Sequence, residues 1–533
     1  MSPFMTEWAG RLPHSKDAAY DTRQTPDNEE PQGCMAGTRE QILDELEKWA
    51  ISDTPSKVFW LNGMAGTGKT SIAHTLSERL DEKQMLGASF FCSRSASQTV
   101  KDASLIIPTI AAKLSQASPL LLSETVQIIE KEPDVGSMHT LSKQFRLLLL
   151  EPIRRALGPS VKTYKIVVID AFDECINLGT VEKLVQSVVD YTPAMPLKFF
   201  ISSRDTTRIR GAFHHNRTHL PKILSLHEIE RTVVQEDIKL YLDTSLSAIV
   251  QRNLLSICWP PPDELEILLE QADRWFIYAT TAVRYIGVPE VDFRERLKHI
   301  THLTPARLQT GVIDSLYNEI MRQAFHYQLE PEEVSRRHKA LSAVVFVLVP
   351  LSLDAIACLL GMDNLQAQVA LSPFRSVIQM PAADTSPVTI FHASFPDFIV
   401  DPSRCEKQFK LARSGGHRSL AVDCLRCLNL TLKRNICNLD TNTTRSFFHE
   451  PNAILEALRY SCLHWALHFA HALAGALAQT AVTELQDLVS VFVNDHLLHW
   501  FECLSALREL ESGIKSLDIA NEAISVSTQF DLD

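Results

Sequence analysis

Residues Gly63–Thr70 constrain the fold of this chain more than any other stretch, because they read Gly-Met-Ala-Gly-Thr-Gly-Lys-Thr. An apolar run, Val58–Leu61, precedes them, and a helical pattern, Ser71–Leu80, follows. Glycines let backbone N–H groups turn towards phosphate oxygens, and the start of a helix adds its positive dipole end. Lys69 can supply a charge to the β- and γ-phosphates, and Thr70 a hydroxyl to Mg²⁺. The pattern predicts a phosphate-binding loop between a strand and a helix.

This loop predicts a bound purine nucleoside triphosphate, which we expect to be ATP with Mg²⁺. The loop contacts phosphates and not the base, so GTP remains an alternative. The residues expected to contact the nucleotide here are Gly63, Ala65, Gly66, Thr67, Gly68, Lys69, Thr70 and Ser71.

Further apolar runs alternate with helix-like stretches after the loop. The predicted strands are Ala88–Cys92, Lys165–Asp170, Lys198–Ser203 and Ile223–Leu226. Predicted helices include Ile106–Leu114, Ser142–Leu157 and Val181–Tyr191. Strands that alternate with helices form a parallel sheet covered on both faces, so we expect a doubly wound α/β P-loop domain. Beyond about residue 230 the pattern is almost entirely helical, except for a short strand-like piece at Val388–Phe391.

Three carboxylates and one arginine follow two of the predicted strands. Asp170 ends its strand, where it can hold Mg²⁺, and either Asp173 or Glu174 can act as a general base on a water molecule. Arg204 directly follows Lys198–Ser203 and can place its guanidinium at the γ-phosphate. The alternatives are an acidic turn that caps the next helix and an arginine on the surface.

The motifs GMAGTGKT, KIVVIDAFDEC and FFISSR, in this order, resemble the NACHT class of STAND NTPases, which are signalling relatives of the AAA+ proteins. Within that class, the chain is most similar to the nephrocystin-type NTPase module of fungal proteins. Further stretches that resemble it are CMAGTREQILDELEKWA, VFWLNGMAGTGKT, GASFFCSR, LSLHEIE followed by DIKLYL, FIYATTAVRYI, PLSLDAIACLLGM and IFHASFPDFIVD. The resemblance covers about residues 34–510.

The resemblance implies a role for several residues. Gly37, Thr38 and Arg39 match a turn that contacts adenine and ribose in this class. The three carboxylates match its extended Walker B motif, and Arg204 matches its sensor position. His392, within IFHASFPDF, matches a winged-helix histidine that touches the β-phosphate of ADP in resting STAND proteins; read alone, it would be a structural residue.

The resemblance also implies a domain order. We expect a polar tail or linker (1–35), a P-loop NTPase domain (36–228), a small helical domain (229–300), a winged-helix-like domain (301–404) and a helical C-terminal domain (405–533). Where the family often has Gly-Leu before the FIYATTA-like segment, this chain has Arg274-Trp275, which puts the helix–nucleotide contact there in doubt. We also expect the effector and repeat-sensor parts typical of STAND proteins to come from partners, unless the chain is a truncated member.

Composition excludes several other classes. The net charge of −12, without a run of basic residues, argues against nucleic-acid binding. The apolar stretch Leu463–Val482 contains His464, His468 and His471 on one helical face, which predicts an amphipathic helix and not a membrane span. The first residues lack the pattern of a signal peptide, and the 11 scattered cysteines indicate reduced thiols, so we expect a cytoplasmic protein.

Taken with the resemblance, these features imply a signalling switch controlled by ATP and ADP. We expect a weak Mg²⁺-dependent nucleoside triphosphatase whose slow hydrolysis controls a closed-to-open transition and self-association. The resemblance to fungal NLR-like proteins implies non-self recognition or cell death, a form of innate immunity. The alternatives are an AAA+-like turnover ATPase, a nucleotide-binding scaffold with little hydrolysis and a small-molecule kinase; the kinase fits the long helical remainder poorly.

Overall fold

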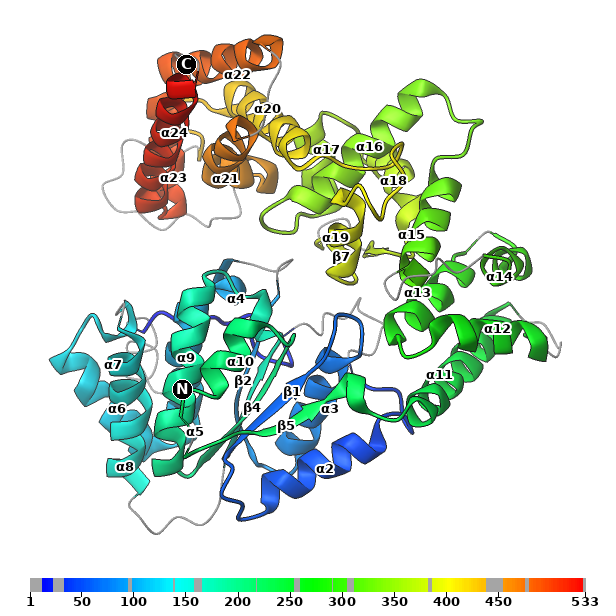
Figure 1. Ribbon diagram of the computed structural model, residues 1–533. Helices are drawn as coiled ribbons and strands as arrows, with labels where there is room; N and C mark the ends of the chain where they lie inside the picture. The colour runs from blue at the N-terminus through cyan, green and yellow to red at the C-terminus, as the bar shows by residue number, and fades with distance from the viewer. Residues whose placement is uncertain are drawn as a thin grey trace. The chain divides into compact units, whose positions relative to one another are not determined.

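The computed structural model describes residues 12–22, 33–93, 98–137, 140–157, 165–216, 218–253, 259–289, 291–303, 311–381, 386–437, 454–474 and 479–530. The chain folds into two compact units, Met1–His302 and Leu303–Asp533. The first unit contains a sheet with its covering helices, followed by four helices (Figure 1).

The strands of the first unit are β1 (Val58–Asn62), β2 (Leu86–Phe91), β3 (Lys165–Asp170), β4 (Leu197–Ser203) and β5 (Lys222–Ser225). Its helices are α2 (Glu40–Ile51), α3 (Lys69–Glu82), α4 (Gln98–Lys101), α5 (Ile106–Ala117), α6 (Pro119–Lys131), α7 (Leu141–Phe145), α8 (Glu151–Leu157), α9 (Leu178–Tyr191), α10 (Thr207–Phe213), α11 (Arg231–Arg252), α12 (Pro262–Ala272), α13 (Phe276–Ile286) and α14 (Phe293–Thr301). A π-helical turn, Arg146–Leu150, joins α7 to α8, and short 3₁₀ turns lie at Ala103–Leu105, Val135–Ser137, Phe172–Glu174, Thr192–Ala194 and Leu226–Glu228.

The five strands form one parallel sheet in the order β2-β3-β4-β1-β5. The predicted strands are therefore all present, and the doubly wound fold class is confirmed. Because β4 lies between β1 and β3, the residues that follow β4 lie between the P-loop and the acidic cluster. In parallel strands these carboxyl ends meet at one edge of the sheet, where ligands bind in such folds.

Both faces of the sheet are buried, which explains the continuous apolar strands. Phe59 and Leu61 of β1 pack with α2 and α3, while Val58 and Trp60 pack in the core that includes α5, α9 and α10. Successive side chains of a strand point to opposite faces, so this alternation places one helical layer on each side. The layers are visible in Figure 1, with α2 and α3 on one face and α5 and α9 on the other.

Residues 12–22 differ from the predicted tail. Leu12 and Ala18 are fully buried, and the Ala18 carbonyl accepts a hydrogen bond from the Phe91 N–H at 2.8 Å. The Tyr20 N–H donates to the Ser89 hydroxyl at 3.1 Å. β2 is an edge strand, so this segment satisfies backbone groups that an edge otherwise leaves exposed. Its few apolar residues are too short a run to show periodicity, and its packing was therefore missed.

The second unit is built mainly of helices. They are α15 (Gly311–Ala324), α16 (Pro331–Phe346), α17 (Leu353–Leu360), α18 (Asn364–Leu371), α19 (Ser394–Val400), α20 (Arg413–Thr431), α21 (Glu456–Leu473), α22 (Gln479–Val491), α23 (Leu497–Leu507) and α24 (Leu510–Phe530). A 3₁₀ turn lies at Ser372–Phe374 and a π-helical turn at Phe492–His496. The expected strand near residue 390 is β7 (Thr389–Ile390), and it pairs with β6 (Ile378–Gln379), which has no clear signal in the sequence.

A buried hydrogen-bond chain runs through the core of this unit, where α20 packs on α21. The Tyr460 hydroxyl accepts from the Leu348 N–H at 3.0 Å and lies 2.6 Å from His468 Nε2. His468 Nδ1 lies 2.9 Å from His417 Nδ1, so one of these two nitrogens donates and the other accepts. The part of the predicted amphipathic helix that lies in α21 thus packs against protein, and its His468 is fully buried. Within the described residues, no helix is long and apolar enough to cross a bilayer.

Candidate functional site

The P-loop joins β1 to α3, which begins at Lys69. Gly66 and Gly68 have φ angles of 78° and 90°, in the left-handed region that side chains disfavour. A Cβ on Gly66 would lie 2.2 Å from Cγ2 of Ile277, in the first turn of α13. Glycine is therefore required at position 66 both by conformation and by the close approach of α13.

The Lys69 ammonium lies inside this loop and donates to the carbonyls of Gly63 and Met64 at 2.8 Å each. Burial lowers the pKa of Lys69, and the carboxylates of Asp173 and Asp170 oppose this shift. The Lys69 ammonium and the predicted carboxylates are therefore close enough to interact electrostatically.

Asp170 lies at the end of β3 and is 1% exposed. The Ser202 hydroxyl of β4 donates to Asp170 Oδ1 and accepts a hydrogen bond from the Ala171 N–H at 3.0 Å. Ala171 has a φ of 50°, which turns the chain sharply towards the rest of the acidic cluster. Ser202 was missed as a site residue, although it stands in the FFISSR motif, because its role depends on β4 being next to β3.

Asp173 contacts Arg204 through both of its carboxylate oxygens. Asp173 Oδ1 accepts from the backbone N–H of Arg204 at 2.8 Å, and Asp173 Oδ2 forms an ion pair with Arg204 Nε at 3.1 Å. Asp173 is 6% exposed, whereas the neighbouring Glu174 is only half-buried. Because the Asp173 carboxylate is engaged with Arg204 and orients it, Glu174 is the better candidate for a general base.

The Gly37–Arg39 turn contacts the P-loop directly. Gly37 and Arg39 have φ angles of 84° and 59°, and the Thr38 hydroxyl donates to the Met35 carbonyl at 2.7 Å. Arg39 Nη2 donates to the Thr67 carbonyl at 3.0 Å. The residues that the resemblance relates to adenine and ribose are thus placed beside the phosphate-binding loop.

Helix α13 meets the same loop from the helical part of the unit. The Ile277 N–H donates to the Gly66 carbonyl at 3.1 Å. The unusual Arg274 lies just before this helix, and its Nη1 donates to the His227 carbonyl at 2.9 Å. The Arg274-Trp275 departure therefore leaves α13 in contact with the P-loop.

His392 belongs to the second unit, whereas the P-loop belongs to the first. It follows β7 and is half-buried. Its Nδ1 accepts from the Ser394 N–H at 3.1 Å and lies 2.8 Å from the Ser394 hydroxyl. A neutral imidazole that accepts at Nδ1 carries its proton on Nε2, which is then a donor.

The donor set fits a Mg²⁺-bound nucleoside triphosphate. Backbone amides of a glycine-rich loop, a half-buried lysine and a helix N-terminus together favour a polyphosphate. Thr70 exposes its side chain next to this loop, and it would share Mg²⁺ with Asp170. In the described residues no cluster of three or more His, Cys, Asp or Glu could hold a metal. Mg²⁺ in such sites usually takes one or two carboxylates plus phosphate and water, so it needs no such cluster.

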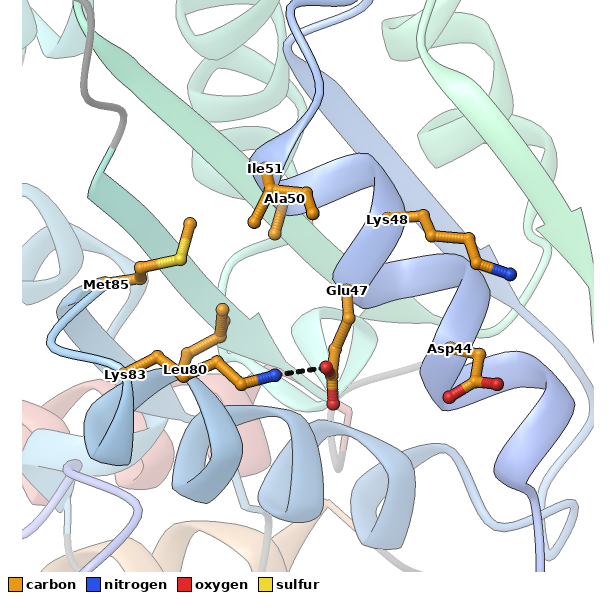
Figure 2. A pocket seen from close by; sticks show the side chains of 8 residues that line it. All are labelled: Asp44, Glu47, Lys48, Ala50, Ile51, Leu80, Lys83 and Met85. Atoms are coloured by element: carbon orange, nitrogen blue, oxygen red, sulfur yellow. Dashed lines mark hydrogen bonds and ion pairs between the residues drawn. The ribbon is translucent and has the colours of Figure 1, made fainter.

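A hollow of 220 Å³ lies between α2 and α3, near their carboxyl ends (Figure 2). Glu47 and Lys83 form an ion pair across it. Its lining residues are Asp44, Glu47, Lys48, Ala50, Ile51, Leu80, Lys83 and Met85. None of these residues belongs to the P-loop or the acidic cluster, so this hollow is not the nucleotide site.

Known sequences are similar to parts of this chain. Residues 37–204 match the family model "Nephrocystin 3, N-terminal". The vegetative incompatibility protein HET-E-1 of Podospora anserina is 23% identical over 520 residues, which is 89% of this chain and 35% of that protein. The chain thus spans about a third of the length of this curated relative.

Solved structures share only a general likeness with the chain. A structure of Drosophila ORC bound to DNA covers 63% of this chain and 81% of its own, at 13% identity and a TM-score of 0.26. A crystal structure of a DNA replication initiation factor covers 89% and 92%, at 11% identity and a TM-score of 0.24. Scores this low carry no conclusion about the arrangement of this chain. The family match over residues 37–204 and the similarity to this curated relative support a nephrocystin-type NTPase module of the fungal NLR type in this chain.

Proposed function

We propose that this protein is a signalling switch that binds ATP and ADP and hydrolyses ATP slowly with Mg²⁺. The observation that carries the proposal is the convergence of Lys69 with Asp170, Asp173, Glu174 and Arg204 at the carboxyl ends of β1, β3 and β4. These residues supply the parts that phosphoryl transfer needs, namely phosphate binding, metal coordination, water activation and charge stabilisation.

Each residue has a separate task in this proposal. Lys69 and the loop amides hold the β- and γ-phosphates, while Thr70 and Asp170 hold Mg²⁺, which neutralises phosphate charge when bound. Glu174 accepts a proton from the attacking water. Asp173 keeps the Arg204 guanidinium at the γ-phosphate edge of the sheet. A switch differs from a turnover ATPase or a scaffold in hydrolysing its nucleotide slowly and changing state when it does.

In the resting state, we assign His392 as a donor to the β-phosphate of ADP. The support is its place in IFHASFPDF together with the tautomer that its contacts with Ser394 select. A donor that engages only ADP would favour the ADP-bound state, because a ligand shifts an equilibrium only through differential affinity. Exchange for ATP would then open the protein and allow self-association in the cytoplasm, with effector or sensor partners still to be identified. The similarity to a vegetative incompatibility protein supports non-self recognition and cell death as the process.

Glu174→Gln tests the switch, since it removes the base but keeps the shape of the side chain. We expect the variant to bind ATP like the wild type, to hydrolyse it at least about tenfold more slowly, and to accumulate in the ATP-bound, self-associated form. Single-turnover hydrolysis and light scattering measure these two effects. Glu182→Gln, on the following helix α9, is the matched control and should behave as the wild type. Hydrolysis at the wild-type rate would remove Glu174 from this role, and unchanged particle size with trapped ATP would refute the switch.

A further inference from the structure

Two successive carbonyl groups of the P-loop are held from outside the loop. The Thr67 carbonyl accepts from Arg39 Nη2 at 3.0 Å, and the Gly66 carbonyl accepts from the Ile277 N–H at 3.1 Å. In a trans peptide the C=O and N–H point in opposite directions. Holding the Thr67 carbonyl therefore turns the Gly68 N–H towards the inside of the loop, and holding the Gly66 carbonyl does the same for the Thr67 N–H. Amides turned inward in this way are the groups that bind phosphate.

Arg39 is itself firmly placed. It is 5% exposed, and its guanidinium lies 4.6 Å from the ring centre of Phe276 on α13. The Asp237 carboxylate of α11 accepts from the Arg39 N–H at 3.2 Å and lies 3.8 Å from Arg39 Nε. Asp237 thus supports both the charge of this arginine and its left-handed backbone, which is costly for a residue other than glycine.

We propose that Arg39 is a positioning residue for phosphate binding, which fixes the Thr67–Gly68 peptide so that its amide faces the phosphates. This inference rests on the proposed nucleotide site. It assigns Arg39 mainly to positioning the loop, and not to contacting adenine or ribose. The guanidinium already donates to the Thr67 carbonyl and covers the Phe276 ring. It connects the loop with α11 and α13, so a shift of these helices changes the phosphate-binding amides directly.

A probe without a base separates the two roles of Arg39. Displacement of a fluorescent ATP analogue by ATP and by Mg²⁺–tripolyphosphate would be measured well below the melting temperature of every variant. Arg39→Met should weaken ATP and tripolyphosphate by the same factor, at least about tenfold, as expected for loss of a charge-assisted hydrogen bond. Asp237→Asn keeps an acceptor for the Arg39 N–H and should weaken both probes equally, but less. Arg231→Met removes an exposed arginine of α11 that pairs with Asp273, and should change neither affinity.

Each outcome decides the question. Loss of ATP affinity with unchanged tripolyphosphate affinity in Arg39→Met would show a base or ribose contact and overturn the proposal. Unchanged affinity for both probes would overturn it as well. A wild-type protein that binds ATP but not tripolyphosphate would also overturn the proposal, because a loop positioned by Arg39 must bind phosphates without the base. A wild-type protein that binds neither probe would instead refute the proposed nucleotide site itself.

Discussion

Removing the Ser202 hydroxyl should both destabilise the first unit and weaken its response to Mg²⁺. In Ser202→Ala the buried Ala171 N–H loses its acceptor, which costs about 1–3 kcal/mol. Asp170 loses a donor to its charged carboxylate, a bond worth about 1.5–3 kcal/mol. The loop can relax and water can reach part of the site, so we expect a net loss near the sum of the two lower values, about 2.5 kcal/mol. The Asp170 carboxylate then loses one of the contacts that orient it for binding Mg²⁺.

Ser203→Ala is the matched control, because Ser203 is equally buried and adjacent on β4. Its hydroxyl accepts from the Trp60 indole N–H at 2.9 Å and does not contact Asp170 in the described structure. Both variants should unfold at lower urea concentration than the wild type. Only Ser202→Ala should lose the difference in ATP affinity between Mg²⁺-containing and Mg²⁺-free buffer. If Ser202→Ala keeps the full Mg²⁺ effect, the reasoning about Asp170 orientation is wrong.

Two further predictions concern the second unit. His392→Leu should lower the affinity for ADP more than the affinity for ATP and raise the self-associated fraction. An equal loss of affinity for both nucleotides, with a lower melting temperature and unchanged particle size, would show a purely structural histidine. Burial, with His471 and Arg413 nearby, lowers the pKa of His417 from 6.5 to about 4, so the unfolded chain binds more protons between these values. The second unit should therefore lose stability as the pH falls from 6.5 towards 4. His417→Gln cannot gain a proton, so it should reduce this dependence in urea titrations, and burial of His468, which also lowers its pKa, should preserve the remainder. An unchanged slope would contradict the assignment to His417.

Local sequence signals were enough to predict the sheet and much of the site. Each strand is a short, continuous apolar run because both faces of the sheet are covered, and the strand ends are marked by Gly63, Asp170 and Arg204. Parallel strands bring their carboxyl ends to one edge, so order along the chain was sufficient to group the P-loop with the acidic cluster.

Other features depend on contacts between distant residues and could not be predicted in this way. Ser202 matters because β4 lies beside β3, and Arg39 because α11 and α13 approach the P-loop. The polar segment 12–22 packs on β2 through backbone groups, which leave no mark in the side-chain pattern. The separate tasks proposed for Asp173 and Glu174 likewise rest on the position of Arg204 and not on the acidic run itself.

Nucleotide binding by the P-loop is the central claim, and titration calorimetry of nucleotide-free protein with Mg²⁺–ATP tests it most directly. The wild type should bind one ATP per chain, and Lys69→Ala should weaken binding at least about tenfold, or about 1.4 kcal/mol, because the phosphates lose their ammonium partner. Lys83→Ala, which removes a half-exposed lysine just beyond the same helix, should bind like the wild type. Equal affinity of Lys69→Ala and the wild type, or no binding by the wild type, would contradict the account.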